Sequence, residues 1–213
     1  MKMIDSFIFD LDGVIVFTDK YHYLAWKEMA DELGVYFDEK INNRLRGVSR
    51  MDSLEIILER YEGPNLSDER KVELATHKNN IYRELLNKMT PADVTDEVRD
   101  TLKTLREKGI KISLGSSSKN ARLILEKVDL LDAFDEISDG NNITKSKPDP
   151  EVFLKAAEFL HSDPSTCAVL EDAISGIEAA KAAGMTAVAI GDATASEKAD
   201  YRINTFSDIL KLI

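Results

Sequence analysis

The sequence predicts an α/β protein whose doubly wound parallel sheet, a Rossmann-like core, carries an inserted α-helical domain. Three observations lead to this fold class. Short apolar runs alternate with helical patterns from about residue 95 onward, which is typical of a parallel sheet with helices on both faces. A strand-like run at residues 4–9 comes much earlier in the chain. The stretch between the two shows only helical periodicity, so it is expected to be an insertion after the first strand.

We interpret the insertion as a cap domain and expect it to span residues 17–90. The core is expected to comprise residues 1–16 and 91–213. Glycine and proline mark where its helices end: Gly34 follows the first, and Gly63-Pro64 follows the second. The apolar positions that predict three helices are Trp26, Met29, Ala30 and Leu33, then Leu54, Ile57, Leu58 and Tyr61, then Val72, Ala75, Tyr82, Leu85 and Leu86.

In the alternating region, buried strands are predicted at residues 110–114, 167–170 and 186–190. Ser118 is expected to cap the helix after the first of these strands. Asp149-Pro150 is interpreted as an N-cap followed by a proline at the first helical position. The helices of this region are predicted from Val98, Leu102 and Leu105, from Ala121, Leu123, Ile124 and Leu125, from Val152, Phe153, Ala156 and Leu160, and from residues 173–183 before Gly184.

Composition excludes several classes of protein. The 213 residues are 43% apolar and 31% charged, as in globular proteins, and no apolar run approaches the roughly 18 residues of a membrane span. A net charge of −11 argues against nucleic-acid and membrane partners, although not against a phosphorylated substrate. The single cysteine, Cys167, and the absence of a signal-peptide pattern lead us to expect a cytoplasmic protein. We also expect a monomer. With only His22, His77 and His161 besides, an imidazole or thiolate metal site is not expected.

The run at residues 4–9 delivers two carboxylates, Asp10 and Asp12, into a turn at Gly13. Buried aspartates are rare unless they are paired or bind a metal, because removing a carboxylate from water is costly. Ligand sites of parallel sheets lie beyond the carboxyl ends of the strands, which is where this pair would lie. Taken alone, the pattern is equally compatible with an ordinary Asp-Gly turn.

Further polar residues follow other predicted strands of the same sheet. Residues 116–118 are three serines after one strand, Glu171 and Asp172 follow another, and Lys147 precedes a helix. If the strands are parallel, these groups meet the first-strand pair at one edge. Four carboxylates repel one another unless a cation neutralises them, and oxygen ligands favour Mg²⁺. A lysine and a serine suit the oxygens of a phosphoryl group, and a carboxylate can be the nucleophile.

These motifs resemble those of the haloacid dehalogenase-like phosphotransferases, a family that carries a helical cap. The matching segments, in order, are Phe9-Asp10-Leu11-Asp12-Gly13-Val14, Ser116, Lys147-Pro148 and Glu171-Asp172. The resemblance implies that Asp10 is the nucleophile and Asp12 the general acid and base, while Ser116 and Lys147 hold the phosphate. It also implies Mg²⁺ bound by Asp10, the backbone carbonyl of Asp12, Glu171 and Asp172.

Other segments resemble the members of that family that interconvert β-glucose 1-phosphate and glucose 6-phosphate through β-glucose 1,6-bisphosphate. The implied sugar-phosphate contacts are Thr18, His22, Trp26, Lys27, Arg46, Gly47, Val48, Ser49, Arg50, Lys78, Ser116, Ser117, Ser118, Lys119, Asn120 and Lys147. Arg50 would dock the distal phosphate, for which a guanidinium is well suited. The chain departs from the pattern at Phe17, Met51 and Ala173.

Structural interpretations stand beside these roles. Trp26 fits the apolar face of its helix, Lys78 alone would be a solvated lysine, and Lys119 and Asn120 suit a helix start as well as a substrate contact. Two other functions also remain open. A sugar-phosphate phosphatase would share every core residue and differ in how the cap treats water. A binding module that kept only the fold is disfavoured by the intact acidic residues, for which it has no use.

Overall fold

The computed structural model describes residues 4–45 and 49–213. The chain divides into two compact units, residues 1–17 with 89–213, and residues 18–88. The boundaries expected from the sequence were 16/17 and 90/91, and the assignment of the second unit as a cap stays a prediction. None of the helices within the described ranges is long and apolar enough to cross a membrane.

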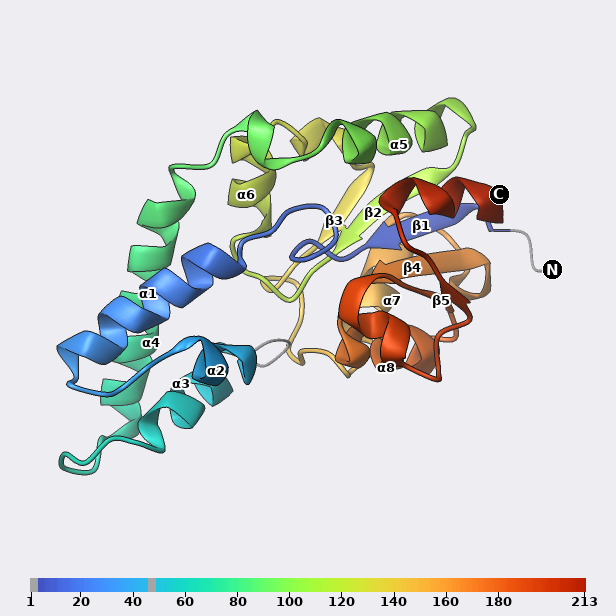
Figure 1. Ribbon diagram of the computed structural model, residues 1–213. Helices are drawn as coiled ribbons and strands as arrows, with labels where there is room; N and C mark the ends of the chain where they lie inside the picture. Colours follow the sequence, from blue (N-terminus) through green and yellow to red (C-terminus); the bar gives the residue numbers. More distant parts are fainter. Residues whose placement is uncertain (1–3, 46–48) are drawn as a thin grey trace. The chain divides into compact units, whose positions relative to one another are not determined.

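The first unit is built on one six-stranded sheet in the order β3-β2-β1-β4-β5-β6, in which every pairing is parallel (Figure 1). This strand order is that of a Rossmann-type fold, as predicted. The strands are β1 (Ser6–Phe9), β2 (Lys111–Gly115), β3 (Glu136–Ser138), β4 (Cys167–Glu171), β5 (Thr186–Ala189) and β6 (Tyr201–Arg202). The α-helices of this unit are α5 (Asp96–Glu107), α6 (Ala121–Lys127), α7 (Glu151–Phe159) and α8 (Ile174–Ala182). Short 3-10 helices cover Pro91–Asp93, Leu131–Ala133, Pro164–Thr166, Gly191–Ala195 (η4) and Phe206–Leu212 (η5).

Both faces of β1 are buried, because its alternating side chains pack against different helices. Ile8 belongs to an apolar cluster with Phe153 of α7, which also includes residues of α8. Phe9 instead stacks on Phe206 of η5 with ring centroids 5.4 Å apart, and Phe7 stacks on Phe9. Burying each such side chain contributes about 1.5–3 kcal/mol. The central strand therefore holds its carboxyl end in a fixed place.

Register brings three strand ends to one level. Phe9, the last residue of β1, lies opposite Leu114 of β2 on one side and Leu170 of β4 on the other. The hydrogen bond from the Asp10 N–H to the Leu170 carbonyl, 3.0 Å long, continues this ladder. The residues that follow β1, β2 and β4 are consequently neighbours, which is the convergence that the sequence predicts.

Two predicted helix starts are wrong by one or two residues. The N-cap of α6 is Asn120, and Ser118 instead accepts the Asn120 N–H within the preceding turn, at 3.2 Å. The N-cap of α7 is Pro150, although the Asp149 carboxylate still accepts the Glu151 N–H at 3.0 Å. Both side chains satisfy a backbone donor near the helix start, but through local turns that fall just before it.

Among its described residues, the second unit contains helices and loops but no strand. It contains α1 (Asp19–Glu32), α2 (Glu39–Asn43), α3 (Arg50–Leu58) and α4 (Asp68–Leu86). Its apolar core joins residues of all four helices, including Trp26 and Met29 of α1 and Leu54 of α3. Ser49 and Ser67 cap α3 and α4 by accepting the backbone N–H groups three positions ahead, as such residues ordinarily do.

Candidate active site

The loop after β1 presents Asp10 and Asp12 at the centre of the sheet edge. Asp10 is buried and Asp12 is half-buried. Gly13 makes the turn possible in two ways. Its φ of +88° lies in the region that glycine adopts without steric cost, and a Cβ there would be only 2.0 Å from Oδ2 of Asp172. The Gly13 N–H also donates to the Val16 carbonyl at 2.7 Å, so the chain folds back directly after the two aspartates.

Lys147 forms hydrogen bonds with residues at the carboxyl ends of both β1 and β4. Its ammonium donates hydrogen bonds to Oδ1 of Asp10 and Oε1 of Glu171, and all three side chains are at least nine-tenths buried. Burial alone would lower the pKa of Lys147, but the charges of Asp10 and Glu171 outweigh it and raise the pKa. Lys147 therefore stays a cation at neutral pH, in contact with the predicted nucleophile.

Glu171 and Asp172 complete an acidic cluster beyond β4. Burial, with Asp10 as a nearby like charge, raises the pKa of Glu171 to about 7 despite Lys147. Burial followed by repulsion from Asp10 and Glu171 raises the pKa of Asp172 to about 8. The start of α8 also holds the Glu171 side chain in place. Its Oε2 accepts the Ala173 N–H at 3.0 Å, and it packs so closely on Gly176 that a Cβ there would lie 1.9 Å from the Glu171 carboxyl carbon.

This cluster fits a divalent cation. One ligand oxygen from each of Asp10, Glu171 and Asp172 lies within 4.8 Å of the others. When ionised, the three carboxylates and the Lys147 ammonium leave two negative charges, and this excess adds to burial in raising the pKa values of Glu171 and Asp172. A cation with two positive charges and a preference for oxygen ligands, such as Mg²⁺, neutralises it. The contribution of the Asp12 carbonyl stays a prediction.

Residues 116–120, which we call the phosphate loop, follow β2 beside this cluster. The Ser116 N–H continues the sheet by donating to the Ser138 carbonyl of β3, at 3.1 Å. Ser116 is buried, and its Oγ accepts the Ser118 N–H at 3.1 Å. Lys119 is exposed, whereas Asn120 is buried. The structure thus brings Ser116 to the same strand-end level as Asp10, as predicted.

A second group of predicted residues lies within the helical unit. Lys78 of α4 is buried, and its Nζ lies 2.9 Å from Nδ1 of His22, 4.6 Å from the centre of the Trp26 ring and 4.8 Å from that of Tyr82. The His22 ring stacks on Tyr82 with centroids 4.0 Å apart. Because an ammonium only donates, Nδ1 must accept and the proton of neutral His22 resides on Nε2.

Burial and nearby positive charge keep His22 neutral. Burial first, then the positive charges of Lys78 and Arg50, lower the pKa of His22 well below 6.5. Arg50 is the first residue of α3, and its guanidinium donates to Oδ1 of Asn79 at 2.9 Å. Burial lowers its pKa, but a guanidinium remains charged. The unit therefore gathers two cations, Arg50 and Lys78, around an uncharged imidazole.

The remaining predicted contacts are placed as follows. Thr18 is buried and its carbonyl accepts the N–H groups of Tyr21 and His22. Lys27 pairs with Asp31 on the helix surface, and Ser49 caps α3. Arg46, Gly47 and Val48 lie outside the described residues. Tyr82 was assigned only to an apolar helix face. Its position four residues after Lys78, on the same side of α4, is the signal that could have identified it.

Comparisons with known proteins agree with this geometry. A model of the haloacid dehalogenase-like hydrolases matches residues 4–184. The chain is 43% identical over 204 residues to a β-phosphoglucomutase of Bacillus subtilis, covering 95% of this chain and 90% of the relative. It is 32% identical to a phosphorylated carbohydrates phosphatase of Thermotoga maritima, covering 85% and 82%. A solved β-phosphoglucomutase from Clostridium difficile has a TM-score of 0.89 at 39% identity, covering 97% of this chain and 93% of that one.

Proposed function

The chain belongs to the haloacid dehalogenase-like hydrolase family, and we propose that it interconverts β-glucose 1-phosphate and glucose 6-phosphate through β-glucose 1,6-bisphosphate. The observation that carries this proposal is the contact of Lys147 with both Asp10 and Glu171 at the carboxyl end of the central strand. The similarity to two β-phosphoglucomutases supports the choice of substrate. In this proposal the protein is an isomerase that works by phosphoryl transfer.

The reaction consists of a step that loads Asp10, followed by a cycle of two phosphoryl transfers through Asp10. A carboxylate oxygen of Asp10 attacks one phosphorus of the bisphosphate, the bond from that phosphorus to the sugar oxygen breaks, and Asp12 gives this oxygen a proton. The resulting aspartyl-phosphate then transfers its group to the C6 hydroxyl of β-glucose 1-phosphate, whose proton goes to Asp12. The new bisphosphate then reorients in the site and gives its C1 phosphoryl group to Asp10, and this transfer releases glucose 6-phosphate.

The neighbouring residues act on charge and position. Lys147 and Ser116 would donate hydrogen bonds to the oxygens of the transferring group, whose charge spreads over them in the transition state. When bound by Asp10, Glu171, Asp172 and the Asp12 carbonyl, Mg²⁺ would supply further positive charge at the same place. Bisphosphate serves as the activator, because it is the species that loads Asp10.

The helical unit would select the sugar phosphate and exclude water from the aspartyl-phosphate, whose hydrolysis would end the cycle. Arg50 is proposed to bind the phosphate that is not being transferred, and His22 and Lys78 to contact the sugar phosphate. Lys119 and Asn120 of the phosphate loop are proposed to take part in the same recognition. The monomeric state and the cytoplasmic location also stay predictions, the first testable by light scattering.

One experiment separates the candidate functions. The enzyme is incubated with β-glucose 1-phosphate, Mg²⁺ and a trace of β-glucose 1,6-bisphosphate, and glucose 6-phosphate and inorganic phosphate are measured together. A mutase gives glucose 6-phosphate in large excess. Free phosphate as the main product would instead support a sugar-phosphate phosphatase, the second candidate, which the similarity to the Thermotoga maritima phosphatase favours. A binding module would give neither product.

A further inference from the structure

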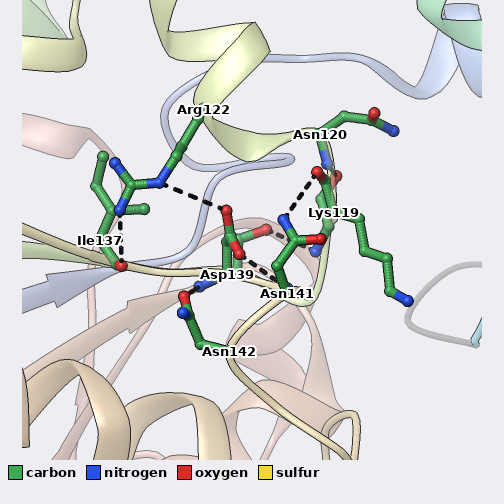
Figure 2. Close-up of polar contacts among 9 residues, drawn as sticks. Lys119, Asn120, Arg122, Ile137, Asp139, Asn141 and Asn142 are labelled. Atoms are coloured by element: carbon green, nitrogen blue, oxygen red, sulfur yellow. Dashed lines mark hydrogen bonds and ion pairs between the residues drawn. The ribbon is translucent and has the colours of Figure 1, made fainter.

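The turn that follows β3 forms a polar cluster against the phosphate loop (Figure 2). Its central residue is Asp139, whose carboxylate is buried and lies 3.9 Å from Nε of Arg122. Oδ1 of Asp139 accepts the Asn141 N–H at 2.8 Å, and the Asp139 N–H donates to the Asn142 side chain at 3.0 Å. These bonds close a turn of the Asx type, in which an aspartate fixes the backbone two residues ahead. None of these residues is used in the reaction proposed above.

Two hydrogen bonds connect this turn to the phosphate loop. The Gly140 N–H donates to the Ser118 carbonyl, and Nδ2 of Asn141 donates to the Lys119 carbonyl, each at 3.2 Å. Figure 2 shows the Asn141 side chain directed at Lys119, while Asn142 is directed back at Asp139. Because C=O and N–H of a trans peptide point in opposite directions, holding both carbonyls turns the N–H groups of Lys119 and Asn120 away from the turn.

Close packing requires glycine at position 140. A Cβ there would lie 2.4 Å from the Ser117 carbonyl oxygen and 2.9 Å from the Lys119 nitrogen. Both are backbone atoms, so the phosphate loop itself would have to move. Gly140 has no unusual φ that explains its presence. The close approach of two backbone segments is therefore the reason for glycine at this position.

We propose that residues 139–141 position the phosphate loop for the sugar phosphate, with Gly140 and Asn141 as its direct contacts and Asp139 holding the turn. This inference rests on the proposed function in one respect, the assignment of Lys119 and Asn120 to sugar-phosphate recognition. Residues that bind a substrate must be held within a fraction of an ångström, and loops need supporting contacts to achieve this. Gly140 and Asn141 are thus positioning residues for sugar-phosphate recognition.

The test compares two substrates, acetyl phosphate and β-glucose 1-phosphate, in Asn141→Ala and Gly140→Ala. Acetyl phosphate needs only the site around Asp10, whereas β-glucose 1-phosphate also needs the recognition residues. Loss of one neutral hydrogen bond changes an equilibrium about three- to tenfold, and Asn141→Ala should raise KM for β-glucose 1-phosphate by this amount with kcat little changed. Gly140→Ala should raise it at least as much. In Asn141→Ala, which loses only the hydrogen bond to the Lys119 carbonyl, hydrolysis of acetyl phosphate should stay within about twofold of wild type.

Asn142→Ala is the matched control, since it removes the same side chain and one hydrogen bond of the same turn but no contact with the phosphate loop. A KM unchanged in Asn141→Ala and Gly140→Ala, or raised equally in Asn142→Ala, would overturn the proposal. If one variant fails to fold, the other still decides. Inhibition of acetyl phosphate hydrolysis by glucose 6-phosphate gives a second measurement that needs no isomerisation. If the wild-type protein bound glucose 6-phosphate but did not isomerise β-glucose 1-phosphate, the proposed function would be contradicted and the proposal about residues 139–141 would not.

Discussion

At the scale of single residues, the site around Asp10 is determined by charge. Lys147 lies between Asp10 and Glu171 in a buried environment, where a lone carboxylate would be strongly destabilised. The same arrangement leaves negative charge in excess, which adds to burial in raising the pKa of Asp172 to about 8. One set of contacts thus accounts for both the carboxylate proposed as nucleophile and the proposed cation site.

Replacing Asp10 by Asn tests the nucleophile. The amide keeps the shape of the side chain but cannot form the aspartyl-phosphate, so kcat with β-glucose 1-phosphate should fall by several orders of magnitude. Circular dichroism should show an unchanged fold, and intact-mass measurement after exposure to acetyl phosphate should show no added phosphoryl group. Activity above about a tenth of wild type would refute the assignment.

Removing the metal, or one of its expected ligands, tests the acidic cluster. Turnover should cease in excess EDTA and return on adding Mg²⁺. Asp172→Ala should raise the Mg²⁺ concentration needed for half-maximal activity at least tenfold, because it removes one of three converging carboxylates. Asp192→Ala, in η4 after β5, serves as a control of the same chemistry outside the cluster. Full turnover in EDTA would contradict the metal site.

Gly176 gives an independent test of how Glu171 is held. Alanine in place of glycine inside a helix ordinarily stabilises a protein by about 1 kcal/mol. In α8 the added methyl group would instead meet the Glu171 carboxyl group at 1.9 Å. We expect Gly176→Ala to lower both the melting temperature and kcat, whereas Ser175→Ala in the same helix should change neither. A stabilised, active Gly176→Ala enzyme would show that Glu171 is not packed against this helix.

At the scale of elements, the strands of the site could be predicted because their signal is local. The runs that form β1, β4 and β5 are largely apolar on both faces, and β2 carries Ile112 and Leu114 on one face. Each of the four was predicted to within two residues. Strands β3 and β6 were missed, since they contain three and two residues and depend on pairing with distant segments. Helix α2, five residues long, was missed for the same lack of length.

The missed elements explain what was missed at the site. Asp10 and Glu171 directly follow predicted strands, and Lys147 precedes a predicted helix. The structure brings these three side chains together as expected. The turn at residues 139–141 follows β3, so without that strand nothing in the sequence placed it beside residues 116–120. Likewise, the stacking of His22 on Tyr82 joins α1 and α4, a pairing that periodicity alone does not specify.

The α1–α4 pair carries a prediction about pH. The pKa of His22 is well below 6.5 in the folded protein, while in the unfolded chain it returns to about 6.5. Between these two values the unfolded state binds more protons, so the free energy of unfolding falls as the pH drops below about 6.5. His22→Gln should lose less stability than wild type between pH 7.5 and pH 5.

Urea unfolding followed by the fluorescence of Trp26, the only tryptophan of the chain, measures this directly. The side chain lies beside Lys78 in the helical unit, so its signal reports on that unit. His77→Gln, which removes an exposed histidine of the same unit that contacts Glu32, should not reduce the loss of stability in acid. An identical pH dependence in wild type and His22→Gln would disprove the argument.

At the scale of the whole molecule, the two compact units are proposed to divide the work between chemistry and selection. The residues proposed for phosphoryl transfer, Asp10, Lys147 and Asp172 among them, all belong to the first unit. Arg50, His22 and Lys78 all belong to the second, 71-residue stretch between residues 18 and 88. If this division is correct, a substitution in the second unit should affect large and small phosphoryl donors differently.

Arg50→Ala is the decisive substitution. Losing a hydrogen bond between a guanidinium and a phosphate costs about 1.5–3 kcal/mol, so kcat/KM for β-glucose 1-phosphate should fall about ten- to a hundredfold. Hydrolysis of acetyl phosphate, which carries no second phosphate, should change less than about threefold. The ratio of glucose 6-phosphate to free phosphate should fall as well, because a sugar phosphate held less well competes less effectively with water for the aspartyl-phosphate.

Arg44→Ala is the matched control, since Arg44 pairs with Glu59 on the surface of the same unit at 2.7 Å. If Arg50→Ala slowed the reactions of β-glucose 1-phosphate and acetyl phosphate equally, Arg50 would act through the fold rather than by contacting the substrate. If the product ratio also stayed at its wild-type value, the helical unit would not control the choice between sugar and water, and the phosphatase interpretation would gain support.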